Sequence, residues 1–144
     1  MRAMMTAAAL AALTMATPAS AQQTSDLSGT WSFQTASYGN EQFGVIMSGA
    51  AVFIATTAGR YTVRLIANER IVQRETSQFR LLVARQNCVA EDEGGQIAIT
   101  CNLIDTVEGY EPDNFVLQAG ENADELVGAL SSGSSPQVTF TRLR

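Results

Sequence analysis

The sequence contains no histidine and no lysine, and only two of its 144 residues are cysteine. Histidine is the usual general base near neutral pH, and Schiff-base or thiol catalysis requires a lysine or a free cysteine. A pair of carboxylates, as in glycoside hydrolysis, stays open. No spacing selects two of the acidic candidates, which are Asp26, Asp105, Glu108, Glu111 and Asp113. We therefore expect a protein that is not an enzyme, has no catalytic residues and needs no cofactor.

Positive charge and long apolar runs are also scarce. The chain has nine arginines and 14 acidic residues, which gives a formal charge of −5. Loss of Arg2 with a signal peptide would lower this charge by one, to −6. Nucleic acids and anionic membranes are poor partners for such a surface. No segment reaches the ~20 apolar residues that a membrane-spanning helix needs. We expect neither nucleic-acid binding nor a membrane span.

The first 21 residues have the features of a signal peptide. Arg2 supplies a positive start, residues 3–16 are apolar, and Ala19-Ser20-Ala21 is an A-x-A cleavage site. Cleavage after Ala21 predicts a periplasmic or secreted protein. The polar residues 22–28 then form a flexible N-terminal segment, and residues 29–144 suit a single domain.

The two cysteines lie in a predicted hairpin. Gly94-Gly95 favours a two-residue turn, and residues whose numbers sum to 189 then face each other, so that Cys88 lies opposite Cys101. The pair is of the non-hydrogen-bonded type, with Cα atoms roughly 4.5 Å apart, which a disulfide can span. Export to an oxidising compartment favours the bond. A redox or metal site is disfavoured, because the spacing is not C-x-x-C and histidine is absent.

The rest of the chain reads as about eight or nine short strands with turn signals between them, and it contains no convincing helix. An even number of hairpin-linked strands favours closure, which removes exposed edges. We predict an all-β fold, an antiparallel up-and-down β-barrel of about eight strands, with a β-sandwich as the alternative.

Two sets of apolar residues before and within the cysteine hairpin would lie on opposite faces of a regular strand. Phe79, Leu81 and Val83 are odd-numbered, whereas the face of Cys88 is even-numbered. If both sets point inward, residues 85–87 must contain a bulge or a break.

The tripeptide Gly29-Thr30-Trp31 opens the first strand. It resembles the start of a lipocalin-like, or calycin, barrel, and the size of the chain is similar to that of small bacterial lipocalin-like proteins, which include inhibitors of secreted metalloproteases. The resemblance implies that Trp31 packs across a closed end of the barrel and meets a basic residue of the last strand. Arg142 is similar in position to that residue.

A barrel of eight strands can hold one small molecule among apolar side chains. We therefore expect non-covalent binding, with a small apolar ligand as the first hypothesis. The candidate ligand-binding residues are equally well explained as core, and they are Tyr61, Val63, Leu65, Phe79, Leu81 and Phe115.

The alternative function is a protein-binding module, such as a secreted-protease inhibitor or a cell-envelope partner. Residues 22–28, or Tyr110 in a long polar loop, would supply the contact. The other arrangement for Tyr110 is a ring folded back over the barrel mouth. We expect a monomer in either case.

Two acidic clusters invite comparison with calcium sites, which use oxygen ligands. Glu91, Asp92 and Glu93 lie at the hairpin tip, and Glu108, Glu111 and Asp113 lie in the long loop. Neighbouring residues of a strand point to opposite faces, so the tip residues cannot converge. Solvated charges are the favoured interpretation, and we assign no metal site.

Overall fold

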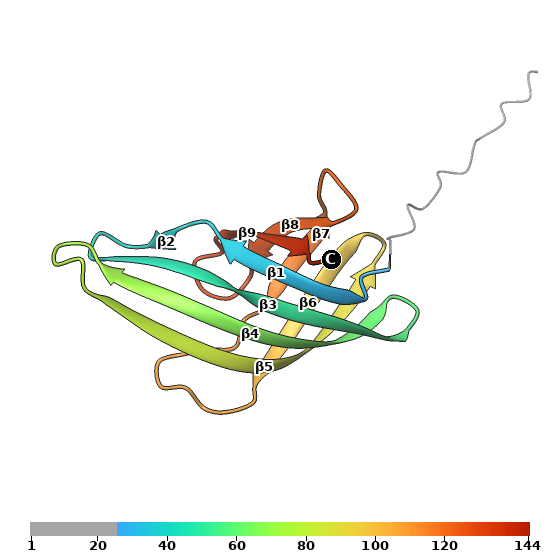
Figure 1. Ribbon diagram of the computed structural model, residues 1–144, viewed down its shortest axis with the longest axis horizontal. Helices are drawn as coiled ribbons and strands as arrows, with labels where there is room; N and C mark the ends of the chain where they lie inside the picture. Colours follow the sequence, from blue (N-terminus) through green and yellow to red (C-terminus); the bar gives the residue numbers. More distant parts are fainter. Residues whose placement is uncertain (1–25) are drawn as a thin grey trace, which may run out of the picture.

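The computed structural model describes residues 26–144, which form nine β-strands (Figure 1). They are β1 (Gly29–Thr35), β2 (Tyr38–Gly39), β3 (Phe43–Thr57), β4 (Arg60–Gln73), β5 (Phe79–Glu93), β6 (Gln96–Leu103), β7 (Phe115–Ala119), β8 (Glu125–Leu130) and β9 (Gln137–Arg142). This part of the chain contains no helix, and so none that could cross a membrane. The predicted signal peptide, its cleavage site and residues 22–25 lie outside the described residues.

Eight of the strands close into an antiparallel barrel. Strands β3 to β9 pair in sequence order, and β1 pairs with β9 on one side and with β3 on the other. Trp31 shows the closure, because it faces Arg142 of β9 and Ala51 of β3. Strand β2 lies outside the ring, beside β3. The predicted up-and-down barrel is confirmed, the sandwich alternative is wrong, and the architecture is consistent with a calycin-like fold.

The β5–β6 hairpin has the register derived from the sequence. Cys88 faces Cys101 with Cα atoms 4.0 Å apart, and the two residues form a disulfide. The turn residues Gly94 and Gly95 have φ angles of 70° and 99°, which side chains disfavour. A disulfide is compatible with an oxidising, exported location.

The bulge expected near residues 85–87 is absent from β5. Its register with β4 is unbroken from Glu91 to Phe79, so the even-numbered residues lie on the same face along the whole strand. Ala84, Gln86 and Cys88 point into the barrel and are buried. The expectation that Phe79 and Leu81 face inward is therefore wrong, and they lie on the outer surface with 63% and 53% of their area exposed.

Aromatic rings fill the middle of the barrel. Phe33, Phe115 and Phe140 pack against one another, with ring centres 4.9 to 5.6 Å apart. The ring of Phe33 lies over Gly49 of the neighbouring strand β3. A Cβ atom at residue 49 would come within 2.7 Å of that ring and 2.0 Å of the Ile66 carbonyl oxygen. Glycine is therefore required for the close approach of these strands.

Candidate functional site

The Gly29-Thr30-Trp31 motif lies at one end of the barrel and closes it. Trp31 is fully buried, its Nε1 donates to the carbonyl oxygen of Leu27 at 2.9 Å, and its ring lies 4.4 Å from the guanidinium carbon of Arg142. Gly29 has a φ of +126°, and a Cβ there would meet Arg142 at 3.2 Å. The contact between Trp31 and Arg142 that the family resemblance implied is present.

Residues 26–28 belong to the segment predicted to be flexible, yet they are held against this closed end. Arg142 donates through Nη2 to the Asp26 carbonyl at 2.7 Å and through Nη1 to the Ser28 carbonyl. Leu27 is buried, and its backbone N–H donates to the Tyr61 hydroxyl at 3.2 Å. A ligand does not enter the barrel at this end, because chain and side chains cover it.

The candidate ligand-binding residues separate into two groups. Tyr61, Val63, Leu65 and Phe115 are buried in one continuous core, packed against other side chains. Phe79 and Leu81 lie outside the barrel. None of these residues lines the cavity at the opposite end of the barrel, where the polar groups gather.

That opposite end, the mouth, contains an open cavity of about 520 Å³. Strands β3, β4 and β5 are the longest in the barrel, at 15, 14 and 15 residues, and lie side by side (Figure 1). Met47 of β3 and Glu69 of β4 line the cavity. The loop between β6 and β7 and the loop between β8 and β9 complete it. The cavity is lined by Tyr38, Met47, Glu69, Gly109, Tyr110, Glu111, Asp113, Leu130, Ser132 and Gly133.

Asp113 is the central polar group of the mouth, with only 3% of its area exposed. Its Oδ2 accepts hydrogen bonds from Gln86 Nε2 and from the Tyr110 hydroxyl, both at 2.6 Å. Its backbone N–H donates to Gln86 Oε1 at 2.8 Å. Tyr110 is thus folded back over the mouth, as the second arrangement for this residue predicts, and the network fixes the β6–β7 loop to β5.

One oxygen of Asp113 has no hydrogen-bond donor among residues 26–144. Both side-chain donors engage Oδ2, and no donor of residues 26–144 reaches Oδ1. No buried side-chain oxygen or nitrogen in this part of the chain lacks a hydrogen-bond partner. Oδ1 therefore keeps a small solvent-accessible area, on a residue that lines the cavity.

Burial perturbs the acids of the mouth. It raises the pKa of Asp113 above the ordinary value, although the hydrogen bonds from Tyr110 and Gln86 oppose the shift. Burial, then the charge of Asp113, raises the pKa of Glu69, while Arg80 lowers it. Burial also raises the pKa of Tyr38 and of Tyr110, so both phenols stay neutral and can donate hydrogen bonds. The mouth thus holds two acidic side chains whose pKa values are raised by burial, and Arg80 is the cation that acts on Glu69.

The acids line one cavity without converging on one point. Glu69, Glu111 and Asp113 lie along its wall, and its lining includes no arginine. Even so, residues 26–144 hold no group of three or more acidic or other ligating side chains placed to bind a metal ion. Separated carboxylates around a cavity suit an organic cation with distributed donors better than a single metal ion.

The acidic clusters of the sequence have other surroundings. At the hairpin tip, Glu91 pairs with Arg60 at 3.1 Å, and Asp92 Oδ1 accepts from the Gly95 backbone at 2.9 Å. In the long loop Glu108 and Glu111 are exposed, whereas Asp113 is buried. Glu91 and Asp92 thus serve a surface pair and a turn, in keeping with the interpretation as solvated charges, but that interpretation is wrong for the buried Asp113.

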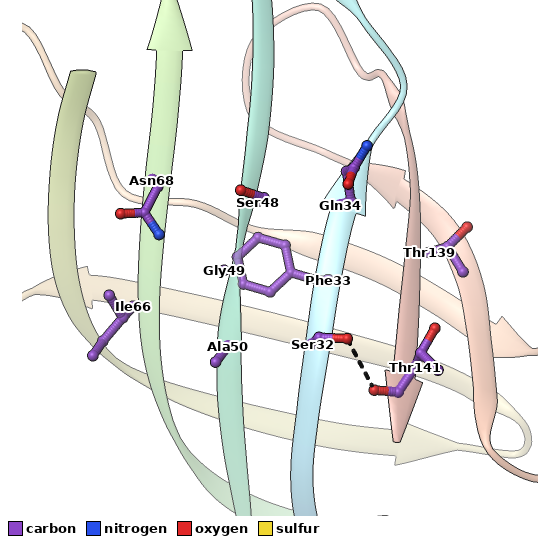
Figure 2. Close-up of a pocket in the computed structure, with 10 residues that line it drawn as sticks. All are labelled: Ser32, Phe33, Gln34, Ser48, Gly49, Ala50, Ile66, Asn68, Thr139 and Thr141. Atoms are coloured by element: carbon purple, nitrogen blue, oxygen red, sulfur yellow. Dashed lines mark hydrogen bonds between the residues drawn. The ribbon is translucent and has the colours of Figure 1, made fainter. Parts of the chain in front are cut away.

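A second hollow of about 610 Å³ lies on the outer wall of the barrel (Figure 2). It crosses β9, β1, β3 and β4 above Gly49, with the Phe33 ring beside that glycine. Its other lining side chains are neutral, and Ser32 Oγ donates to the Thr141 carbonyl at 3.4 Å. No charged group faces this hollow, so its chemistry is less distinctive than that of the mouth.

The sequence analysis missed most of the mouth residues. Tyr110, Glu111 and Asp113 were named, but Tyr38, Met47, Glu69, Gln86 and Leu130 were not. Gln86 had a usable signal, since counting back by two from Cys88 places it on the inner face. Glu69 had none, because residues 67–70 interrupt the alternation of apolar residues in the sequence, whereas β4 continues through them.

The chain matches no protein-family model, and no curated protein is significantly similar to it in sequence.

Proposed function

We propose that this is an exported, lipocalin-like protein that binds a small organic cation at the mouth of its barrel. The observation that carries the proposal is the buried Asp113 carboxylate, which lines an open cavity with no cationic lining residue and whose Oδ1 has no hydrogen-bond donor among residues 26–144. A buried charge is costly unless it is paired, and a bound ammonium group would supply the pair.

The lining also suits the body of such a ligand. Met47 and Leu130 offer apolar surface, and Tyr38 and Tyr110 offer aromatic faces that attract a cation. Glu69 adds a second negative charge on the same cavity. A ligand with an ammonium group and a compact apolar body, rather than a purely apolar ligand, therefore matches the site.

The family assignment and the location are parts of the same proposal. The Gly29-Thr30-Trp31 opening and the stacking of Arg142 on Trp31 support a place among small bacterial lipocalin-like proteins. The disulfide between Cys88 and Cys101 and the signal-like residues 1–21 support export to the periplasm or beyond.

Calorimetric titration tests the binding site. The probes are phenethylammonium, choline and spermidine, with phenethyl alcohol and 3-phenylpropionate as neutral and anionic counterparts. We expect at least one cation to bind at least tenfold more tightly than the neutral and anionic probes, because only a cation pairs with Asp113. If no cation binds with a Kd below about 1 mM, or if the alcohol binds equally well, the proposal fails.

A matched pair of variants locates the effect. Asp113→Asn keeps the size of the side chain and removes its charge, so cation binding should weaken by tenfold or more. Asp105→Asn removes the same charge from an exposed residue of the same loop, where it pairs only with Arg85, and should leave binding unchanged. Equal weakening in both variants would indicate a general charge effect and contradict a site at the mouth.

A further inference from the structure

The first half of β5 is an unpaired edge in an otherwise closed barrel. Strand β4 pairs with β5 from Phe79 onward, but β6 pairs with it only from Gln86 onward. In Figure 1 the long strands β3, β4 and β5 extend beyond the rest of the barrel on one side. Exposed strand edges offer unpaired N–H and C=O groups to other chains, and closed barrels normally remove them.

Two hydrogen bonds show which backbone groups point outward from this edge. Gln73 N donates to Gln78 O on the β4 side, and Ile104 N donates to Arg85 O on the β6 side. Successive residues of an antiparallel strand alternate between the two sides. The N–H and C=O groups of Phe79, Leu81 and Val83 therefore point away from β4. No backbone group within residues 26–144 pairs with them on that side.

The side chains of these residues are large, apolar and exposed. Phe79, Leu81 and Val83 have 63%, 53% and 48% of their area exposed on the outer face of the sheet. Soluble proteins usually protect such an edge with charged side chains, proline or a bulge. Residues 79–83 contain neither proline nor a bulge, and their one charged side chain, Arg80, donates to the Glu108 carbonyl at 3.4 Å.

We propose that residues 79–83 pair with the same segment of a second copy of this chain, antiparallel, with Leu81 on the two-fold axis. With Leu81 on that axis, its two copies form a hydrogen-bonded pair, because the backbone groups of Leu81 point away from β4. The arrangement places Phe79 opposite the Val83 of the other copy, and aromatic with β-branched pairs are favourable. Arg80 then faces Leu82, so no like charges are directly opposed.

Symmetry favours a second copy over an unrelated strand, because the same patch supplies both sides of an isologous interface. Strand pairing over five residues buries less area than the ~1,000 Å² typical of a stable interface. The dimer should therefore dissociate on dilution. This assembly differs from the monomer expected from the sequence, and it does not depend on the proposed cation site.

Cysteine cross-linking tests the register. In Leu81→Cys the two new thiols would face each other in a hydrogen-bonded pair, roughly 5.5 Å apart at Cα, which a disulfide can span. In the control Val83→Cys the two cysteines would be offset by four residues, roughly 13 Å, and cannot join. We expect mild oxidation to give covalent dimers with Leu81→Cys and not with Val83→Cys. Equal cross-linking of both variants would overturn the proposed register.

Sedimentation equilibrium tests the dimer without new cysteines. The wild-type protein should show a concentration-dependent dimer between about 1 and 500 μM, because strand-edge interfaces of this size bind weakly. Leu81→Lys places two like charges on the two-fold axis and should abolish the dimer. Ile54→Lys makes the same change on β3, at a residue 48% exposed and away from the edge, and should keep it. A wild-type monomer throughout this range would overturn the proposal.

Discussion

The guanidinium carbon of Arg142 lies 4.4 Å from the ring centre of Trp31, its register partner across β1 and β9. The same guanidinium donates to the carbonyl oxygens of Asp26 and Ser28, and its Nε lies 3.5 Å from Asp124 Oδ1. One side chain thus covers the buried tryptophan and fixes the chain that enters β1. The closed end of the barrel depends on this contact.

Arg142→Ala should therefore destabilise the protein. The loss combines a cation–π contact with hydrogen bonds from a charged donor, for about 2 to 3 kcal/mol of unfolding free energy. Urea denaturation measures it. Arg144→Ala is a suitable control, since Arg144 is exposed and contacts the same Asp124; it should change stability by less than about 0.5 kcal/mol. If Arg142→Ala lowered the unfolding free energy no more than Arg144→Ala does, Arg142 would not have the structural role described.

Gly49→Ala should be far more harmful than an alanine at a turn glycine. The new Cβ would overlap the Ile66 carbonyl and the Phe33 ring, for a cost of about 3 kcal/mol or more. Gly94→Ala meets no atom within 4 Å, and its cost of roughly 1 to 2 kcal/mol arises only from the φ of +70°. Thermal unfolding of the two variants compares these effects. Equal losses would mean that strand approach at Gly49 is not tight.

Asp113→Asn should stabilise the protein near neutral pH while it weakens cation binding. Asparagine can accept the hydrogen bonds from Gln86 and Tyr110 without placing an unpaired charge in a buried position. We expect a gain on the order of 1 kcal/mol in unfolding free energy at pH 7. Urea denaturation at this pH checks the sign, and a clear loss of stability would show that the charge is better compensated than its surroundings indicate.

The pH dependence of the unfolding free energy, compared between the wild type and Asp113→Asn, gives a second test. Because the pKa of Asp113 is raised on folding, the folded chain holds this proton more tightly than the unfolded chain. The stability that this group contributes is complete below its unfolded pKa of 3.8 and is lost as the pH rises through the folded value. The advantage of Asp113→Asn over the wild type should grow across that window and then remain constant.

Cation binding should follow the opposite trend. Both Asp113 and Glu69 must be ionised to attract a cation, and the pKa of each is raised. Affinity for the best cationic probe should therefore fall as the pH is lowered through these raised values. Calorimetric titration over a pH series measures it. An affinity that does not change with pH in acid would exclude the two carboxylates from the site.

Removal of the disulfide should weaken the barrel without changing its topology. The bond closes a short loop, with a sequence separation of 13 residues, and contributes about 3 kcal/mol in the chain-entropy model. Cys88→Ala with Cys101→Ala should lower the unfolding free energy by about this amount, as measured in urea. The far-ultraviolet circular dichroism spectrum should remain that of a β protein. Unchanged stability would indicate that residues 88–101 have little conformational freedom in the unfolded chain even without the disulfide.

The sequence by itself determined the local relationships. The turn glycines Gly94 and Gly95 set a register in which Cys88 faces Cys101, since hairpin pairing depends only on the turn and on strand alternation. Alternating apolar residues likewise predicted an all-β chain of eight or nine strands. The position of Trp31 at the start of β1 and its contact with Arg142 followed from a family resemblance carried by three residues.

Only the tertiary structure decided which side of β5 faces the core and which groups meet at the mouth. Phe79 and Leu81 look like core residues in the sequence, yet continuous pairing with β4 turns them outward. Gln86 and Asp113 are 27 residues apart, and their contact requires the β6–β7 loop to fold back onto β5. Such encounters depend on the length and closure of distant strands, which no local pattern specifies.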